Sequence, residues 1–381
     1  MRAIVQIVPG LPPAIDGVGD YALAIARALR ERQEIESLFV VANPLSQTLG
    51  VIEGFPVTRV ARKDPASLMS ALRGILASGR AESTTPVLFH CSLYGYARRA
   101  LAFWLQKGLV QWKQRAPEGP LITMFHELVA DGPVWSSAFW LHGVQRGLIR
   151  RFAHASTASL TSNARCRQLL AEIAGIEESQ IAKLAVLSNV GEPGELPPAL
   201  TRKLQLVVFG RPNSRDLAFS RGLKSVCEAF GIERILEVGP DPSRRAHRLP
   251  AVVEATGALA AGEVSAILRD SRFGFIASDA SLLSKSGVFA AYCAHGAVPI
   301  VAGADDGEAD GLYANQQYLR APLRPGIGGD QLEAVSQSAR AWYRGHSVTD
   351  QAAVYAGILD RISETHRAGA GERLVIARRS T

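Results

Sequence analysis

Residues 257–301 read GALAAGEVSAILRDSRFGFIASDASLLSKSGVFAAYCAHGAVPIV, and this stretch decides the fold class. The apolar run 273–277 is short and continuous, as is typical of a buried strand in a parallel sheet. A helix is predicted before it, at 261–270, and another after it, at 288–295. Residues 298–301 then begin a further strand. Strands and helices that alternate at this spacing predict an α/β fold.

The turn Ser284-Lys285-Ser286-Gly287 lies at the start of the second of these helices. A helix N-terminus offers unpaired backbone N–H groups and a positive dipole end, and this turn adds hydroxyls and one cation. Together they predict an anion site, for which phosphate is the usual ligand. A plain serine N-cap with a solvated lysine explains the same residues, and the sequence leaves both interpretations open.

Length and composition describe an ordinary globular protein of two domains. The chain has 381 residues, with 47% hydrophobic and 20% charged side chains, and this length favours two cores over one. No apolar run approaches the roughly 18 residues of a membrane-spanning helix. The N-terminal apolar segment is too short for a secretory signal. We therefore expect a cytoplasmic protein.

Composition and residue spacing argue against several classes of ligand and leave an anionic one. The four cysteines are scattered and the eight histidines show no metal-binding spacing, so neither a disulfide framework nor a protein-held metal is expected. A net charge of +7 suits an anionic ligand or an anionic membrane surface. No basic run carries interleaved aromatic residues, so no nucleic-acid partner is expected.

The first half of the chain begins as a nucleotide-fold unit. Residues 3–8 read as a strand, 9–19 as a turn-rich loop and 20–30 as a helix with Tyr21 and Ile25 at helical spacing. The loop and the helix start place four residues at the carboxyl end of the first strand: Gly17, Val18, Gly19 and Asp20. In open α/β sheets, ligands bind at this end of the strands. The full dinucleotide fingerprint is absent, so dinucleotide binding is not expected.

A titratable pair follows an inner strand of the same half. Residues 121–125 read as a buried strand, which delivers His126 and Glu127 to its carboxyl end, where chemistry occurs in this fold class. A histidine hydrogen-bonded inside the domain and a helix-capping glutamate would give the same pattern, so both readings stay open.

The best linker is the Gly-, Pro- and Glu-rich segment 191–198, after which the βα pattern restarts. We therefore expect an N-terminal domain over 1–195, a C-terminal domain over 200–362 and a basic tail over 363–381. A polar loop with two arginines follows the first strand of the second domain: Gly210, Arg211, Pro212, Asn213, Ser214 and Arg215.

Two consecutive Rossmann-like βαβ domains resemble the GT-B glycosyltransferases, and most of all the large retaining group that uses sugar nucleotides. The similarity spans residues 4–362. It rests on the glycine loop 17–21, on His126-Glu127, on Phe209-Gly210-Arg211, and on the block 256–299, which ends in Ala294-His295-Gly296-Ala297-Val298-Pro299. The resemblance implies two domains that face each other across a cleft.

The resemblance also implies roles for individual residues. Gly17–Gly19 would approach the donor diphosphate or the acceptor, and His126 would lie near the donor sugar. Arg211 or Arg215 would neutralise the diphosphate leaving group, for which a guanidinium fork is well suited. Residues 284–287 would hold phosphate or sugar hydroxyls. The implied partners are a nucleotide sugar, as substrate and not cofactor, and a glycan or lipid-linked acceptor, with peripheral membrane contact left open.

The chain departs from this family at two positions. The family usually carries two glutamates eight residues apart, and Leu283 and Ala291 stand there instead. Lys224 falls roughly where the family often places a phosphate-binding lysine, after a longer loop. The sequence therefore leaves three interpretations. The first is a divergent transferase that uses Lys285 and Ser286 in place of the glutamates, with Glu127 as a hypothetical base. The others are a catalytically degenerate protein that binds a nucleotide sugar or a protein partner, and an epimerase or phosphorylase of the same architecture.

Overall fold

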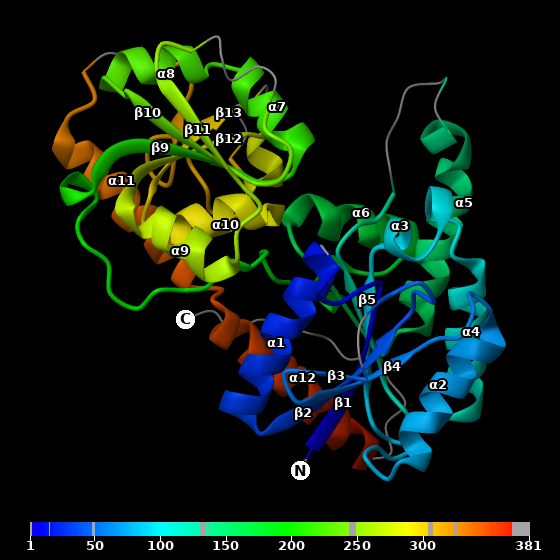
Figure 1. Ribbon diagram of the computed structural model, residues 1–381. Coiled ribbons are helices and arrows are strands. Elements are labelled where there is room, and N and C mark those ends of the chain that lie inside the picture. The colour runs from blue at the N-terminus through cyan, green and yellow to red at the C-terminus, as the bar shows by residue number, and fades with distance from the viewer. Residues whose placement is uncertain are drawn as a thin grey trace. The chain divides into compact units, whose positions relative to one another are not determined.

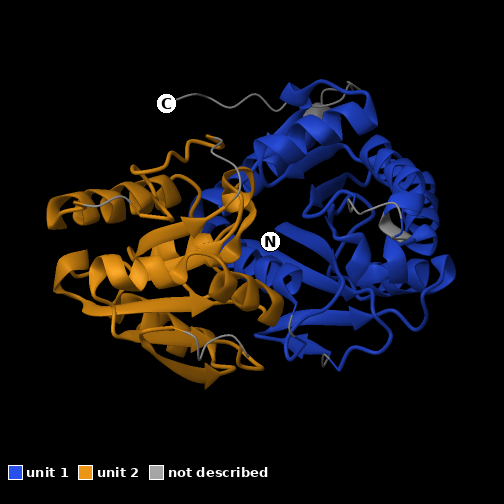
Figure 2. Cartoon of the chain, turned by 90° about the horizontal axis from the view of Figure 1, so that it is seen from above, with its two compact units in different colours: residues 1–184, 348–381 blue, residues 185–347 orange. Residues whose placement is uncertain are grey.

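A computed structural model describes residues 2–14, 16–47, 50–129, 135, 137–243, 249–303, 308–323 and 326–367. The chain divides into two compact units. Unit 1 contains residues 1–184 together with 348–381, and unit 2 contains residues 185–347. Figure 2 colours unit 1 blue and unit 2 orange. Each unit is an α/β sheet covered by helices, which confirms the predicted fold class (Figure 1).

Unit 1 contains an eight-stranded sheet in the order β3-β4-β2-β1-β5-β6-β7-β8, parallel except for the short β3–β4 pair. Its strands are β1 (Arg2–Val8), β2 (Ile35–Val41), β3 (Val51–Ile52), β4 (Phe55–Arg59), β5 (Val87–Cys91), β6 (Leu121–Phe125), β7 (Ala158–Thr161) and β8 (Ile181–Lys183). Its helices are α1 (Gly17–Gln33), α2 (Pro65–Ala77), α3 (Leu93–Tyr96), α4 (Phe103–Arg115), α5 (Ser137–Ala155), α6 (Ala164–Ala174) and α12 (Val348–Arg367), with 3-10 turns η1 (Arg98–Ala100) and η2 (Glu178–Gln180).

The two faces of this sheet bury different side chains, because successive residues of a strand point to opposite faces. One face carries Val5, Ile7 and Phe89 in a core completed by α2, α4, α5 and α6. The opposite face carries Val8 and Phe39, against which the apolar side of α1 packs.

Helix α12 belongs to unit 1, although it follows the last element of unit 2 in sequence. The hydroxyl of Tyr21 in α1 donates to Oε1 of Gln351 in α12 at 2.7 Å and lies 3.2 Å from the hydroxyl of Tyr355. This division differs from the expected domains 1–195 and 200–362. It changes at residue 185 and the chain returns at residue 348, because the buried side of α12 packs on α1. Residues 368–381 of the expected tail lie outside the described residues.

Unit 2 contains a six-stranded parallel sheet in the order β11-β10-β9-β12-β13-β14. Its strands are β9 (Lys203–Phe209), β10 (Arg234–Val238), β11 (Val252–Gly257), β12 (Ser271–Ala277), β13 (Val298–Ala302) and β14 (Leu319–Arg320). Its helices are α7 (Pro212–Ser220), α8 (Leu223–Phe230), α9 (Ala261–Asp270), α10 (Gly287–Ala294) and α11 (Gly329–Arg344), with 3-10 turns η3 (Ala199–Thr201) and η5 (Ala280–Lys285).

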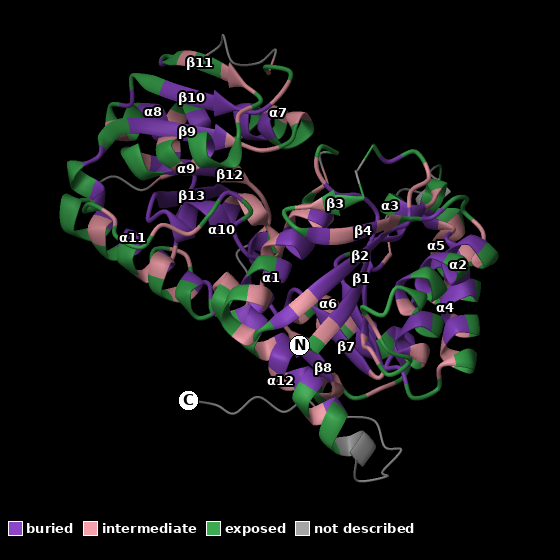
Figure 3. Ribbon diagram, turned by 60° about the horizontal axis from the view of Figure 1, so that its bottom comes forward, coloured by how far each residue is buried: buried purple, intermediate pink, exposed green. Residues whose placement is uncertain are grey.

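The stretch 257–301 forms α9, β12, α10 and β13, in the predicted order of helices and strands. Strands β12 and β13 pair in parallel, and α10 crosses between them. Tyr292 of α10 packs directly on Gly274 of β12, where an added Cβ would lie 2.4 Å from the ring. The Tyr292 hydroxyl donates to the carbonyls of Val207 and Phe275. Figure 3 shows the inner strands buried and β11 exposed at the edge.

One local expectation was wrong. Residues 212–215 form the start of α7 and not a loop, because Pro212 occupies the first turn, where its missing N–H costs nothing. Strand β8 contains only Ile181–Lys183, and the chain from Leu184 to Val190 is irregular. No helix among the described residues is long and apolar enough to cross a bilayer.

Candidate functional site

The strand order of unit 2 reverses between β9 and β12. In sheets of this topology such a reversal leaves a crevice at the carboxyl ends of the two strands, where ligands bind. A cavity of about 150 Å³ lies there. It is lined by Val208, Phe209, Ser214, Ala218, Phe275, Ile276, Ala277, Ser278, Ser286 and Val288. We call it the switch-point cavity.

Two helices begin at the switch-point cavity, and each contributes a serine. Ser286 is the N-cap of α10, and its Oγ accepts from the N–H of Phe289 at 3.2 Å. Ser214 lies in the first turn of α7, whose cap residue makes no side-chain hydrogen bond. Neither helix has an acidic residue in its first turn. The cavity therefore combines hydroxyls with two positive dipole ends, which is a suitable environment for an anion.

Two cations flank this cavity in the sequence. Arg211 is the exposed N-cap of α7, and Lys285 is the half-buried residue before Ser286. Neither makes an ion pair with any residue that the structure describes. Gly210 precedes Arg211 with φ of 131°, a conformation that favours glycine. The predicted residues Gly210, Arg211, Lys285 and Ser286 are thus grouped around the two helix starts.

Arg215 does not take the expected role. Its side chain is fully buried, and Nε donates to Oε1 of Glu237 at 2.9 Å. Its other nitrogens donate to the carbonyls of Gly210, Pro240 and Asp241. With its guanidinium used in this way, Arg215 holds the loop after β9 to the loop after β10. The expectation that it neutralises a diphosphate is therefore replaced by a structural role.

Three other predicted donor-side residues have different surroundings. Lys224 on α8 is largely exposed, and its Nζ lies 3.8 Å from Oε1 of Glu228. It does not line the switch-point cavity. Ser284 is buried, and its Oγ donates to Oδ2 of Asp310 at 2.6 Å. Gly287 is the first residue of α10. The structure therefore brings only part of the predicted phosphate set to the cavity.

Leu283 and Ala291 are both fully buried. Leu283 packs with Phe289 and Val301, and Ala291 packs with Val207 and Val264. Neither side chain is open to a ligand. A carboxylate at either position would have to be accommodated inside an apolar cluster of unit 2.

Unit 1 reverses its strand order between β1 and β5, and a chain of buried polar side chains lies at this point. Nε2 of Gln6 donates to Oγ of Ser37 at 2.8 Å, and Oε1 of Gln6 lies 2.8 Å from Nε2 of His90. Nδ1 of His90 lies 3.0 Å from Nε2 of His126. We call Ser37, Gln6, His90 and His126 the histidine relay.

The hydrogen bonds of the histidine relay determine which ring nitrogens of His90 and His126 carry a proton. Because the Gln6 amide oxygen accepts, Nε2 of His90 is the donor. Burial, and then the nearby His126, hold the pKa of His90 well below its usual value, so the ring is neutral and its Nδ1 accepts. His126 must then carry a proton on Nε2. Of these four residues, only His126 was predicted from the sequence. The signal for Gln6 and His90 was a polar side chain inside each of the apolar strands β1 and β5.

Tyr21 covers the two histidines. Its ring meets His126 edge-on at 5.0 Å between centroids and His90 at 5.9 Å. Burial and the contact with Tyr355 raise the pKa of Tyr21 well above its usual value, so its hydroxyl stays protonated. His126 is itself buried, with 9% of its surface exposed. The relay therefore sits under α1 and α12, with one small opening at His126.

Glu127 is exposed, unlike His126. Its Oε2 accepts from Oγ of Ser92 at 2.9 Å, which ties the end of β6 to the end of β5. Glu127 is thus positioned at the carboxyl edge of the sheet, where a carboxylate can meet a ligand.

Residues 17–20 form the first turn of α1. Oδ1 of Asp16 accepts from the N–H of Val18 at 3.0 Å, and Asp20 adds a second carboxylate. A negatively charged cap already complements the dipole of this helix end, which disfavours a phosphate there. An added Cβ on Gly19 would lie 2.1 Å from the carbonyl oxygen of Gly10, so this glycine is required for close packing.

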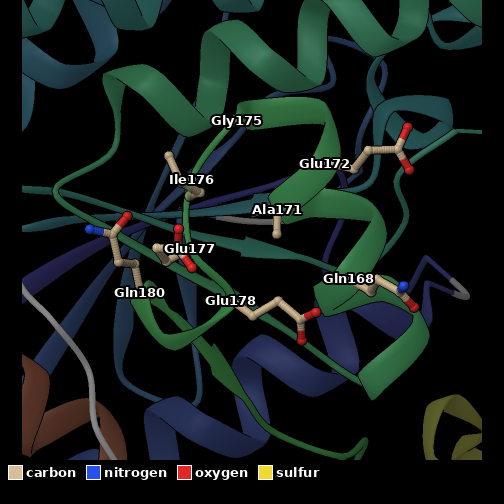
Figure 4. Close-up of a pocket in the computed structure, with 8 residues that line it drawn as sticks. All are labelled: Gln168, Ala171, Glu172, Gly175, Ile176, Glu177, Glu178 and Gln180. Carbon is tan, nitrogen blue, oxygen red and sulfur yellow. The ribbon is translucent and has the colours of Figure 1, made fainter.

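A larger hollow lies elsewhere on unit 1, beside the end of α6 and η2 (Figure 4). It measures about 580 Å³ and carries Glu172, Glu177 and Glu178. Glu172 pairs with Arg146 and Glu178 with Arg167. Because η2 leads directly into β8, this hollow lies at the amino ends of the strands, away from the ligand-binding edge. Among the described residues, no three His, Cys, Asp or Glu side chains are grouped to hold a metal ion.

No protein-family model and no curated protein matches the chain. Solved structures do. A glycosyltransferase from Rickettsia africae ESF-5 is 13% identical, covers 95% of this chain and 99% of its own, and has a TM-score of 0.61. An α-glucosyltransferase in complex with UDP and a 13-mer DNA containing a HMU base is 11% identical, with coverages of 95% and 99% and a TM-score of 0.59.

The lipopolysaccharide outer core galactosyltransferase WaaB, in its apo form, is 8% identical. It covers 94% of this chain and 100% of its own, with a TM-score of 0.56. Since the identities are low, the likeness shows the fold alone. The two α/β units of this chain have the GT-B fold of glycosyltransferases.

Proposed function

We propose that the chain is a glycosyltransferase that moves a sugar from a nucleotide-sugar donor to a glycan, a lipid-linked sugar or a small acceptor. The switch-point cavity carries this proposal, because it joins two helix N-termini, three serines and two nearby cations at the ligand-binding edge of a parallel sheet. The α-glucosyltransferase of the same fold binds UDP. A diphosphate is the ligand that these groups would recognise.

In this proposal unit 2 binds the donor and unit 1 presents the acceptor side. Arg211, Lys285 and the N-termini of α7 and α10 stabilise the negative charge that develops on the leaving diphosphate, without a metal. His126 and Glu127 lie at the carboxyl edge of the other sheet, where they contact the transferred sugar or the acceptor. The reaction retains the configuration of the donor sugar, as in the group that the chain resembles. A cytoplasmic location is consistent with four free cysteines.

The first experiment measures thermal unfolding with a panel of nucleoside diphosphates and nucleotide sugars, with and without magnesium. A ligand at one hundred times its Kd adds about 2.7 kcal/mol, which raises the unfolding midpoint of a unit this size by roughly 5–10 °C. Arg211→Ala and Lys285→Ala should each weaken binding about 10- to 100-fold. Lys203→Ala is the matched control, because it removes one exposed charge at the opposite end of β9.

No shift with any nucleotide would refute the donor site. Equal weakening by Lys203→Ala would show that only net charge matters.

A second candidate is a protein of this fold that binds a nucleotide sugar but does not transfer the sugar. The buried Leu283 and Ala291 favour it, since both positions lack a carboxylate that could contact the ligand. Turnover separates the two candidates. Release of nucleoside diphosphate in the presence of an acceptor, reduced in His126→Ala or Glu127→Gln, supports a transferase. Saturable binding without release supports the binding protein.

A further inference from the structure

The histidine relay crosses four neighbouring strands and ends at a side chain that reaches the surface. Ser37 lies on β2, Gln6 on β1, His90 on β5 and His126 directly after β6, and these strands are adjacent in the sheet. The first three side chains have no exposed surface, whereas His126 has 9%. Apolar side chains would fill the centre of a sheet at a lower desolvation cost than this set of polar groups. Any role of the relay in function must be exerted through His126.

Strand β5 holds His126 at two points. The backbone N–H of His126 donates to the carbonyl of Cys91 at 3.0 Å, and Nε2 of its ring lies 3.0 Å from Nδ1 of His90. The ring of Tyr21 meets the His126 ring edge-on, with 5.0 Å between the centroids. A buried network of satisfied hydrogen bonds is rigid. The imidazole of His126 is therefore held in one orientation.

The relay also selects one tautomer of His126. Because Nε2 of Gln6 donates to Ser37, the Gln6 amide oxygen accepts from Nε2 of His90. Nδ1 of His90 then accepts from Nε2 of His126. A neutral imidazole carries one proton, so Nδ1 of neutral His126 is a hydrogen-bond acceptor and not a donor.

We propose that His90 is a positioning residue of the transferase, which keeps Nδ1 of His126 as the hydrogen-bond acceptor for a hydroxyl of the transferred sugar. Gln6 and Ser37 set the direction of the relay behind His90. A hydroxyl that donates to a rigidly held nitrogen fixes the sugar relative to its leaving diphosphate, which favours the reactive geometry. This inference rests on the proposed function, because it requires a nucleotide sugar as substrate.

The test compares His90→Phe with His90→Asn in the full chain. Phenylalanine keeps an aromatic ring but offers no acceptor, so Nε2 of His126 loses its partner. An unpaired buried N–H is costly, which favours His126 protonated on Nδ1. The carboxamide oxygen of asparagine replaces Nδ1 of His90 as the acceptor. Nitrogen-15 NMR should therefore show His126 protonated on Nδ1 in His90→Phe and on Nε2 in His90→Asn.

Gln6→Leu tests the same relay with both histidines in place. It removes the acceptor for Nε2 of His90, which allows His90 to carry its proton on Nδ1. His126 is then again favoured as the tautomer protonated on Nδ1. A thermal unfolding midpoint for each variant shows that it folds.

Turnover is followed as release of nucleoside diphosphate from UDP-glucose, UDP-galactose and GDP-mannose, with water as the sugar acceptor. His90→Phe and Gln6→Leu should lower kcat about 10- to 100-fold, and His90→Asn should restore most of it. The Kd for free UDP or GDP should not change, because neither carries a sugar. Thr123→Val is the matched control, since it removes a buried hydrogen bond to Ser156 from β6 itself. It should lower the unfolding midpoint and leave kcat unchanged.

An unchanged kcat in both His90→Phe and Gln6→Leu would overturn the inference alone, with the proposed function intact. An equal fall of kcat in Thr123→Val would also overturn it, because any weakening of β6 would then suffice. So would a fall of kcat in His90→Phe without a change in the tautomer of His126. No release of nucleoside diphosphate by the wild type would refute the proposed function and this inference with it.

Discussion

Nδ1 of His90 lies 3.0 Å from Nε2 of His126, and the opposite nitrogen of His90 lies 2.8 Å from the Gln6 amide oxygen. In such a chain each group that donates at one end must accept at the other. The orientation of one buried amide therefore decides which nitrogen of His126 carries its proton. Turning the Gln6 amide over would reverse every donor in the relay.

This relationship predicts the tautomers of both histidines. At neutral pH, nitrogen-15 NMR of histidine-labelled protein should show His90 and His126 protonated on Nε2. Ser37→Ala removes the acceptor for the Gln6 amide nitrogen and should release the amide, giving a mixture of tautomers at a cost of about 1 kcal/mol of unfolding free energy. His126 protonated on Nδ1 in the unchanged protein would contradict the assigned direction of the relay.

Stability should fall as the pH drops below about 6.5. Burial lowers the pKa of His295 to about 4, and its Nδ1 donates to the carbonyl of Ala291 while Nε2 lies 2.8 Å from Oγ of Ser265. Between pH 6.5 and 4 the unfolded chain binds a proton that native His295 refuses. Each pH unit in this window therefore costs roughly 1.4 kcal/mol of unfolding free energy.

Urea unfolding of unit 2 at a series of pH values measures this slope. His295→Gln keeps a hydrogen-bonding side chain and removes the titrating group, so its slope should be lower by about one proton. An unchanged slope would assign the acid sensitivity to other groups.

The order of elements was predictable from sequence because short, largely apolar runs between turn residues, such as those of β6 and β12, are typical of buried strands in a parallel sheet. The destination of α12 was not predictable. The apolar stripe of α12 indicates that one side of the helix is buried, but it does not indicate against which sheet. The partner of that stripe is Tyr21, which lies more than three hundred residues earlier in the chain.

Site residues show the same limit. The Ser284–Gly287 turn could be assigned to a helix start from local residue types, and α10 does begin there. Arg215 could not be separated from Arg211 in that way, because its burial depends on Glu237 in the next strand and on carbonyls after that strand. Gln6 and His90, which lie inside apolar strands, are a stronger indication of a buried polar site than the residue types of a loop. A buried Gln or His requires partners wherever it occurs.

The Arg215–Glu237 pair predicts a large loss of stability when one partner is removed. Both side chains are at most 1% exposed, so Arg215→Met should destabilise unit 2 by about 3–5 kcal/mol by leaving a buried carboxylate unpaired. Lys224→Met breaks the exposed pair with Glu228 and should change stability by less than about 1 kcal/mol. Chemical denaturation compares the two. If Arg215→Met unfolds like wild type but loses nucleotide binding, Arg215 acts on a ligand after all.

Gly19 and Gly17 provide the sharpest comparison, since both begin α1 but only Gly19 is closely packed. Gly19→Ala would place a Cβ 2.1 Å from the backbone oxygen of Gly10, and backbone cannot move aside as a flexible side chain can. It should lower the stability of unit 1 by about 2 kcal/mol or more. Gly17→Ala meets nothing within 4 Å and should be neutral or stabilising by up to about 1 kcal/mol. Urea unfolding of unit 1 measures both variants. If Gly19→Ala kept wild-type stability while nucleotide affinity fell, the glycine would serve a ligand in contact with α1, and the packing explanation would be wrong.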